Sequence, residues 1–255
     1  MKSKEKKQNT GLGVVFIFLV ACIMLIAFLT KAFQIYKNSS FDGVNNYNIA
    51  NLSSRGWKVI SISPQNSMLT IIKISTKDEA KFKQLEIPVD LYSRLDEEID
   101  KYDAKALLRS ILAETSANPF DIFKINLFLK TTTLKSTESI EADIEDSKSL
   151  KMISENLSNP SFLREKLTIE VINATGEAGV GSLVTRLIAN MGGNVILVSS
   201  ANNNQKTSEI QTQEENSQTV KKISRILNVR VTKMTPPLSD VKIIVGEDLL
   251  PKFKQ

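Results

Sequence analysis

The sequence predicts a mixed α/β (α+β) fold with one N-terminal transmembrane helix, a small mixed α+β middle domain and a C-terminal β-α-β-β-α-β domain. Three features of the 255 residues indicate this organisation. An uncharged apolar run lies near the N-terminus, short β-branched runs occupy the middle, and strands alternate with amphipathic helices after residue 166. The hydrophobic fraction of 42% is compatible with a packed core and argues against a wholly disordered chain.

The composition excludes several kinds of catalytic and metal site. The chain contains no histidine, so Ser-His-Asp triads, Cys-His pairs and histidine zinc ligands are excluded. Its single cysteine, Cys22, permits neither an intramolecular disulfide nor a zinc–thiolate cluster. We expect no cofactor, no metal ligands and no catalytic residues.

The net charge of +5 is located entirely at the N-terminus. Residues 1–37 contain six lysines and one glutamate, whereas residues 38–255 contain 27 basic and 27 acidic residues. A neutral domain lacks the positive field that steers nucleic acids. The sequence therefore predicts no nucleic-acid partner, although the isoelectric point of the whole chain is about 9.1.

Residues 11–30 (GLGVVFIFLVACIMLIAFLT) carry no charge and are nearly all apolar. A helix of about 20 such residues spans the hydrocarbon core of a bilayer. Four lysines precede the run, which predicts a cytoplasmic tail over 1–10, a single-pass helix over 11–33 in the cell membrane, and an extracytoplasmic C-terminal part. A cleaved signal peptide and a lipoprotein modified at Cys22 are the alternatives. The apolar run is longer than a signal peptide requires and continues beyond Cys22, which favours the anchor.

The middle of the chain combines a polar stretch with short apolar runs. Residues 34–56 are rich in Asn and Ser and are expected to form a juxtamembrane linker. Residues 57–134 are expected to form a mixed α+β region. The elements expected there are strands over 57–63, 68–75 and 82–87, a helix over 91–114, and a segment over 119–134 that fits either a helix or a strand.

Residues 135–165 are expected to form an acidic linker and a helix. The acidic side chains cluster between residues 138 and 146, and the helical pattern covers 150–157. We interpret the acidic run as a solvated linker or helix face, with a metal site as the alternative.

The pattern after residue 166 is the clearest in the chain. A half-buried strand over 167–172 leads into a Gly-rich turn over 173–181, and a helix with its apolar face at every third or fourth residue ends at Gly192. The remaining elements expected are strands over 195–198, 209–211 and 241–245 and a helix over 220–227. The result is a compact α/β domain.

Residues 166–250 resemble the C-terminal domain of the LytR–CpsA–Psr cell-envelope family. The likeness is carried by residues 168–176 (TIEVINATG), by residues 240–249 (DVKIIVGEDL), and between them by Gly179, Leu183, Leu187, Gly192 and Val195. The resemblance implies a non-catalytic accessory module of the bacterial cell envelope.

Residues 68–134 bear a fainter likeness to the catalytic domain of that family, which transfers lipid-linked polymers to peptidoglycan. In the family an arginine grips pyrophosphate where this sequence has Val89, between Pro88 and Asp90. Without that guanidinium nothing holds pyrophosphate bidentately at this place. We therefore expect residues 57–134 to be a degenerate, transferase-like domain or an unrelated scaffold.

The Gly-rich turn supplies the candidate ligand-binding residues: Asn173, Thr175, Gly176, Gly179 and Gly181. The N-terminus of a helix offers free N–H groups to an anion. The spacing matches neither the dinucleotide fingerprint nor a P-loop, so a purely structural turn is the alternative. Trp57 similarly fits either sugar stacking or a place in the core.

The expected function is that of a membrane-anchored, extracytoplasmic cell-envelope protein that acts as a non-catalytic binding or accessory module in cell-wall assembly. Its expected partners are the membrane and either peptidoglycan, another wall polymer or envelope assembly proteins. The alternative is a phosphotransferase that attaches lipid-linked glycopolymers to peptidoglycan. A transcriptional regulator, suggested only by the historical name of the family, is disfavoured because an exported domain does not reach DNA.

Overall fold

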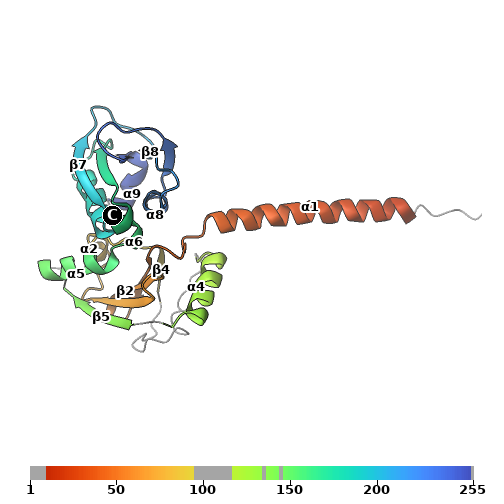
Figure 1. The fold of residues 1–255 in the computed structure, drawn as a ribbon, viewed down its shortest axis with the longest axis horizontal. Coiled ribbons are helices and arrows are strands. Elements are labelled where there is room, and N and C mark those ends of the chain that lie inside the picture. The colour runs from red at the N-terminus through yellow and green to blue at the C-terminus, as the bar shows by residue number, and fades with distance from the viewer. Residues whose placement is uncertain (1–9, 95–116, 134–135, 144–145, 254–255) are drawn as a thin grey trace, which may run out of the picture.

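The computed structural model describes residues 10–94, 117–133, 136–143 and 146–253. A long helix, α1 (Thr10–Lys37), projects from a folded part that contains two five-stranded sheets (Figure 1). The expected mixed fold class is therefore confirmed.

Helix α1 is long and apolar enough over Gly13–Lys37 to cross a membrane. Its large apolar side chains from Val14 to Leu29 are largely exposed, and Cys22 lies among them as a free thiol. Exposed apolar side chains all around a helix are expected of a segment that lies in lipid. The direction in which α1 inserts stays a prediction.

The first sheet has the strand order β4-β1-β2-β3-β5. The central strands are antiparallel, and the two outer strands run parallel to their neighbours. Its strands are β1 (Tyr47–Ser53), β2 (Gly56–Ser63), β3 (Met68–Ile74), β4 (Leu91–Ser93) and β5 (Ser136–Ala142). Strands β2 and β3 confirm two of the expected strands.

The expectation of a linker over residues 34–56 is wrong. Strand β1 lies inside this stretch and pairs with β2 along its whole length, from Tyr47 opposite Ile62 to Ser53 opposite Gly56. Asn45, Asn46 and Asn48, which contributed to the linker prediction, are buried and hydrogen-bonded; Asn48, for example, donates to the carbonyl of Pro88 at 2.8 Å. Tertiary contacts therefore outweigh the low strand propensity of Asn.

The acidic stretch of residues 135–149 is likewise not a linker. Strand β5 pairs with β3 in parallel from Ser136 to Ala142. Helix α5 (Ser147–Leu157) then begins at Asp146, whose carboxylate accepts hydrogen bonds from the amides of Lys148 and Ser149. The helix expected over 150–157 is confirmed, with an earlier start.

Two more elements differ from the expectation. No strand forms over 82–87: helix α2 (Glu79–Lys83), whose N-terminus Asp78 caps, covers the first two of these residues, and a turn follows at 84–85. Helix α4 (Pro119–Thr131) resolves the ambiguous segment, and Asn118 caps it. Most of the helix expected over 91–114 lies outside the described residues, and β4 occupies its first three positions.

Both faces of the first sheet are covered. One face carries Tyr47, Ile60, Ile71 and other apolar residues packed against Ile125 of α4. The opposite face carries Trp57, Val59 and Ile72, packed against α2 and α5. The side chains of β2 alternate between the two clusters, as the period-two geometry of a strand requires.

The second sheet has the strand order β7-β6-β10-β8-β9. Strands β6, β7, β8 and β10 and helices α7 and α8 were all expected, whereas β9 is additional. The strands are β6 (Thr168–Asn173), β7 (Asn194–Ser200), β8 (Glu209–Thr212), β9 (Arg230–Lys233) and β10 (Val241–Val245). The helices are α6 (Pro160–Glu165), α7 (Val180–Asn190), α8 (Gln218–Leu227), η1 (Glu247–Leu249) and α9 (Leu250–Phe253). One apolar cluster joins the sheet to α7 and α8.

Candidate functional site

The Gly-rich turn after β6 brings the predicted ligand-binding residues together, but their polar groups bond within the turn. The Oδ1 of Asn173 accepts from the backbone N–H of Thr175 at 3.1 Å and from its hydroxyl at 2.7 Å. The Nδ2 of Asn173 donates to the carbonyl of Glu177 at 2.8 Å. These contacts account for Asn173 and Thr175 as parts of a turn, and their ligand-binding role stays a prediction.

Backbone geometry explains the glycines of this turn. Gly176 and Gly179 have φ values of +75° and +87°, in the left-handed region that glycine adopts freely. A Cβ on Gly181 would lie 3.2 Å from the Cβ of Asn173. The backbone at Gly176 and Gly179 therefore favours glycine without any ligand, and a side chain at Gly181 would crowd Asn173.

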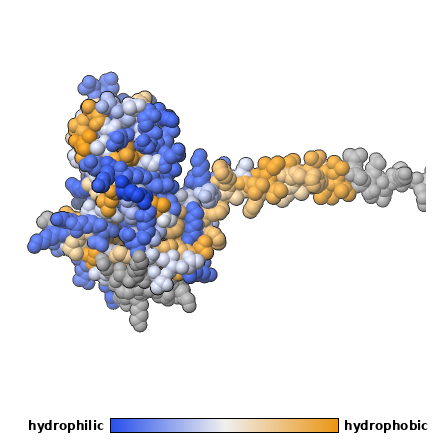
Figure 2. Space-filling view, in the orientation of Figure 1, coloured by the Kyte–Doolittle hydropathy of each residue, from blue (hydrophilic) through white to orange (hydrophobic). Residues whose placement is uncertain are grey.

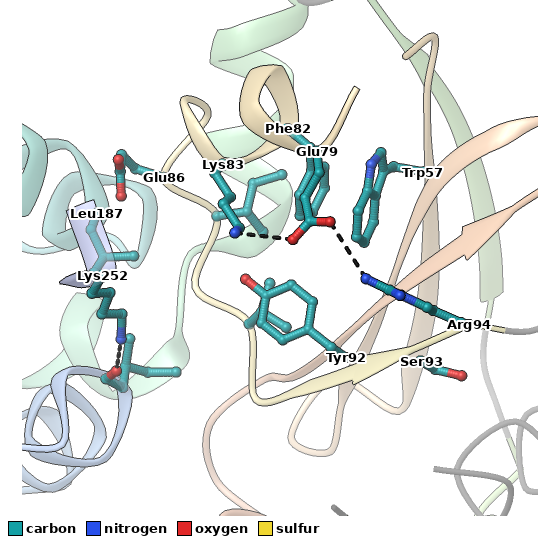
Figure 3. A pocket seen from close by; sticks show the side chains of 13 residues that line it. Trp57, Glu79, Phe82, Lys83, Glu86, Tyr92, Ser93, Arg94, Leu187 and Lys252 are labelled. Carbon is teal, nitrogen blue, oxygen red and sulfur yellow. Dashed lines mark hydrogen bonds and ion pairs between the residues drawn. The ribbon is translucent and has the colours of Figure 1, made fainter. Parts of the chain in front are cut away.

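A pocket of about 410 Å³ lies between the unit built on the first sheet and the unit built on the second (Figure 3). Strands β2 and β4 and helix α2 form one wall. Leu187 of α7, Ile226 of α8 and Lys252 of α9 form the other. Pockets between two structural units are common ligand sites, so this pocket is the candidate functional site.

Three aromatic rings line the pocket. The ring of Trp57 stacks on Phe82, with centroids 4.1 Å apart and planes at 11°, and its edge-to-face neighbour is Tyr92 at 6.3 Å. Trp57 is only 3% exposed, so it belongs to the core, whereas Tyr92 is 48% exposed. Tyr92 is therefore the aromatic side chain that a ligand can reach.

Charged groups stand at the rim beside Tyr92. Glu79 forms one ion pair with Lys83 at 3.0 Å and a second with Arg94 at 3.5 Å (Figure 3). Arg94 is the most exposed of the three. The guanidinium has further N–H groups that can bind an acceptor on a ligand.

Glu86 and Lys252 face the pocket from opposite units. Burial raises the pKa of Glu86 to about 7, and the nearby charges of Arg186 and Lys252 oppose this shift only in part. Burial also lowers the pKa of Lys252. The backbone around Glu86 is held by α7, because Asn190 Nδ2 donates to the carbonyls of Leu85 and Glu86, both at 2.9 Å.

We expect Glu86→Gln to remove a pH dependence of stability. The folded state holds a proton on Glu86 between pH 4.5 and about 7 that the unfolded state lacks, so the free energy of unfolding falls as pH rises through this window. After allowance for solvent screening, the free energy of unfolding of the variant should be about 1–2 kcal/mol higher than that of the parent at pH 8 and equal to it at pH 4. Urea unfolding at both pH values measures this. The exposed Glu215→Gln is the control, and parallel pH profiles of parent and Glu86→Gln would contradict the prediction.

A buried ion pair joins the two units. The Nζ of Lys222 on α8 lies 2.8 Å from both carboxylate oxygens of Asp90 and 2.8 Å from the carbonyl oxygen of Asn46. Both charged side chains are 1% exposed. Burial raises the pKa of Asp90, although the positive charge of Lys222 opposes the shift. Asp90, the acidic residue of the transferase-like pattern, is thus a structural partner of α8.

Sequence reasoning missed Lys222 and Asn190 as contacts between the units. A signal for Lys222 exists, because it lies four residues before the buried Ile226 and so on the buried side of α8. Within the described ranges, no cluster of three or more acidic or cysteine side chains has the arrangement of a metal site.

Comparison with known families adds one match. Residues 166–249 match the family model LytR_C, described as "LytR cell envelope-related transcriptional attenuator". The C-terminal unit is a LytR_C domain. The match covers β6 to η1, so the resemblance drawn from residues 168–176 and 240–249 is confirmed for this unit. The searches of curated proteins and of solved structures returned no match. The LytR_C match associates the chain with the cell envelope, and the matched residues contribute Leu187 and Ile226 to the pocket.

Proposed function

We propose that this chain is a membrane-anchored, extracytoplasmic protein that binds a wall polymer in the pocket between its two units and performs no catalysis. Three features support the proposal. These are the apolar helix α1, the LytR_C match and the pocket whose accessible aromatic group is Tyr92. The pocket carries the proposal, because it is where a ligand meets side chains of both units.

The lining of the pocket suits a segment of glycan. The apolar C–H faces of a sugar ring pack on an aromatic face, and Tyr92 offers one. Sugar hydroxyl and carboxylate groups take hydrogen bonds from an exposed guanidinium, which Arg94 provides. A mostly apolar concavity with a few polar groups at its rim is the usual form of a ligand site.

The state of Asp90 favours binding over polymer transfer. A transferase would need this carboxylate for Mg²⁺ or for the phosphate groups of its substrate. Both carboxylate oxygens instead lie 2.8 Å from Lys222, out of contact with solvent. The transferase alternative would require this buried pair to open.

Co-sedimentation of the full chain in detergent with isolated peptidoglycan sacculi tests the binding proposal. We expect the parent to sediment with the sacculi, and Tyr92→Ala and Arg94→Ala to bind about tenfold more weakly, a loss of roughly 1.4 kcal/mol. Arg230→Ala is the matched control, because Arg230 also forms an exposed ion pair at 3.5 Å, but on β9, away from the pocket. Equal binding by all four proteins, or none by the parent, would contradict the proposed site.

The proposed orientation has its own test. A reporter enzyme that is active only outside the cytoplasm should be active when fused after Gln255 and inactive when fused before Met1. The lysines that precede the apolar run hold the N-terminus on the cytoplasmic side. The reverse pattern of activity would place the LytR_C domain in the cytoplasm and end the proposal of wall binding.

A further inference from the structure

Helix α4 is apolar on both of its sides. One side packs into the first unit through the buried Ile125. The other side exposes Phe123 (63%) and Leu127 (51%), which lie four residues apart and therefore next to each other on the helix surface. A face with two large exposed apolar side chains indicates a contact that the isolated chain does not satisfy.

The N-terminus of α4 is fixed to the C-terminal end of α1. Asn118 Nδ2 donates to the carbonyl of Ile35 at 2.8 Å, and the ring of Phe120 meets Tyr36 edge to face at 5.7 Å. The Nζ of Lys124 lies 4.9 Å from the centre of the Tyr36 ring. The start of α4 therefore lies level with residues 35 and 36 of α1.

That level corresponds to the interface of a bilayer. If residues 11–30 span the hydrocarbon core, Tyr36 lies six residues beyond it, or about 9 Å along the helix at roughly 1.5 Å per residue. The polar headgroup layer extends roughly 5–8 Å from the hydrocarbon on each side, so Tyr36 lies at its outer edge, and a tilt of α1 would bring it nearer to the lipid. Tyrosine is enriched where membrane and water meet.

The apolar surface of α1 continues onto α4. A shallow groove is lined by α1 from Ile26 to Tyr36 and by Phe120 of α4. Figure 1 shows α4 running across the direction of α1, so a bilayer crossed by α1 would meet α4 along its side. Figure 2 shows the hydrophobic surface of α1 extending to the point where it joins the folded part.

We propose that α4 is an interfacial helix, and that Phe123 and Leu127 insert into the headgroup region of the leaflet next to the folded part. Lys130, in the last turn of α4, is exposed on the same side and can reach lipid phosphates. The proposal rests on the proposed membrane anchoring through α1. This insertion would hold the first unit against the surface of the bilayer.

A bilayer is a better occupant of this face than a second copy of the chain. The apolar face of α4 meets the apolar surface of α1 at Phe120, so one lipid phase covers both. The chain dimer remains a named outcome of the test, because it would also bury Phe123.

The test uses single full-length chains in nanodiscs made with lipids brominated near the headgroup, or near the bilayer centre. Tryptophan is introduced by Phe123→Trp on α4, by Phe18→Trp in α1, or by Leu238→Trp on the second unit, where Leu238 is 64% exposed. The emission of the parent, which comes from the buried Trp57, is subtracted. Bromine quenches only the tryptophans that contact lipid.

We expect Phe18→Trp to be quenched by the deep bromines, Phe123→Trp by the shallow bromines with a blue shift, and Leu238→Trp by neither. Quenching at Phe18→Trp without quenching at Phe123→Trp would overturn the α4 proposal while α1 stands as an anchor. No quenching at Phe18→Trp would overturn the anchoring and the α4 proposal together. A blue shift at Phe123→Trp that grows with two chains per disc and without quenching would assign the face to a dimer. Leu127→Trp repeats the test if Phe123→Trp fails to fold.

Discussion

Replacing Lys222 with methionine is expected to destabilise the folded part by about 3–5 kcal/mol, because the substitution leaves the Asp90 carboxylate buried without its cation. Lys222 also donates to the carbonyl of Asn46, which loses this bond. Methionine keeps most of the side-chain volume, so the effect reports the charge. Urea unfolding of the full chain in detergent, followed by circular dichroism, measures it.

Two variants separate the ion pair from a general effect on α8. Lys221→Met changes the neighbouring, partly exposed lysine and should alter the free energy of unfolding by less than about 0.5 kcal/mol. The double variant Lys222→Met with Asp90→Leu should recover part of the loss, since an apolar pair often replaces a buried ion pair without penalty, while the backbone N–H of Asn48 loses its acceptor. A double variant as unstable as Lys222→Met would show that the carboxylate is not the cause.

The LytR_C domain was the most predictable part of the fold. Strand β6 alternates apolar and polar residues, β7 and β10 contain short apolar runs, the helices α7 and α8 carry one apolar face, and Gly192 ends α7 with a φ of +88°. Each local signal agrees with the tertiary fold there. Strand β9 was missed because RVTK has too few apolar residues to stand out, and its pairing with β8 decides its conformation.

The first unit was less predictable because its polar strands owe their burial to distant partners. Nothing in the local pattern of residues 47–53 shows that Asn48 will bond to Pro88, or that β5 will pair with β3 across about 60 residues of chain. Helix α4 was ambiguous for a related reason. Its residues are apolar on both sides, so the period of 3.6 that marks a helix is weak.

The candidate site was predictable only in its parts. Trp57 was singled out as a sugar-stacking or core residue, and it proves to be core, with Phe82 covering one face. Tyr92 and Arg94 line a pocket only because the second unit packs against the first, and no local sequence pattern specifies this packing. The Gly-rich turn was predicted as a ligand site because tight turns and anion sites use the same residue types.

Asp121→Ala is expected to destabilise the first unit by about 2–4 kcal/mol. The buried carboxylate of Asp121 accepts hydrogen bonds from the backbone amides of Ser40 at 3.0 Å and Phe41 at 2.9 Å, and from the hydroxyl of Ser39. Alanine leaves two amides and a hydroxyl without their acceptor. Urea unfolding gives the loss of stability, and hydrogen exchange should show faster exchange at the amides of Ser40 and Phe41.

The comparison that isolates this effect is with Asp78→Ala, which removes an exposed helix cap and should destabilise by only about 1 kcal/mol. Asp121→Asn should fall between the parent and Asp121→Ala, because its amide oxygen still accepts while its NH₂ group faces a donor. Residues 39–41 lie just after α1, so Asp121 ties the C-terminal end of α1 to α4. Exchange in β6 and β10 should therefore stay at the parental rate, and equal acceleration in both sheets would mean that Asp121 supports the whole folded part and not this junction.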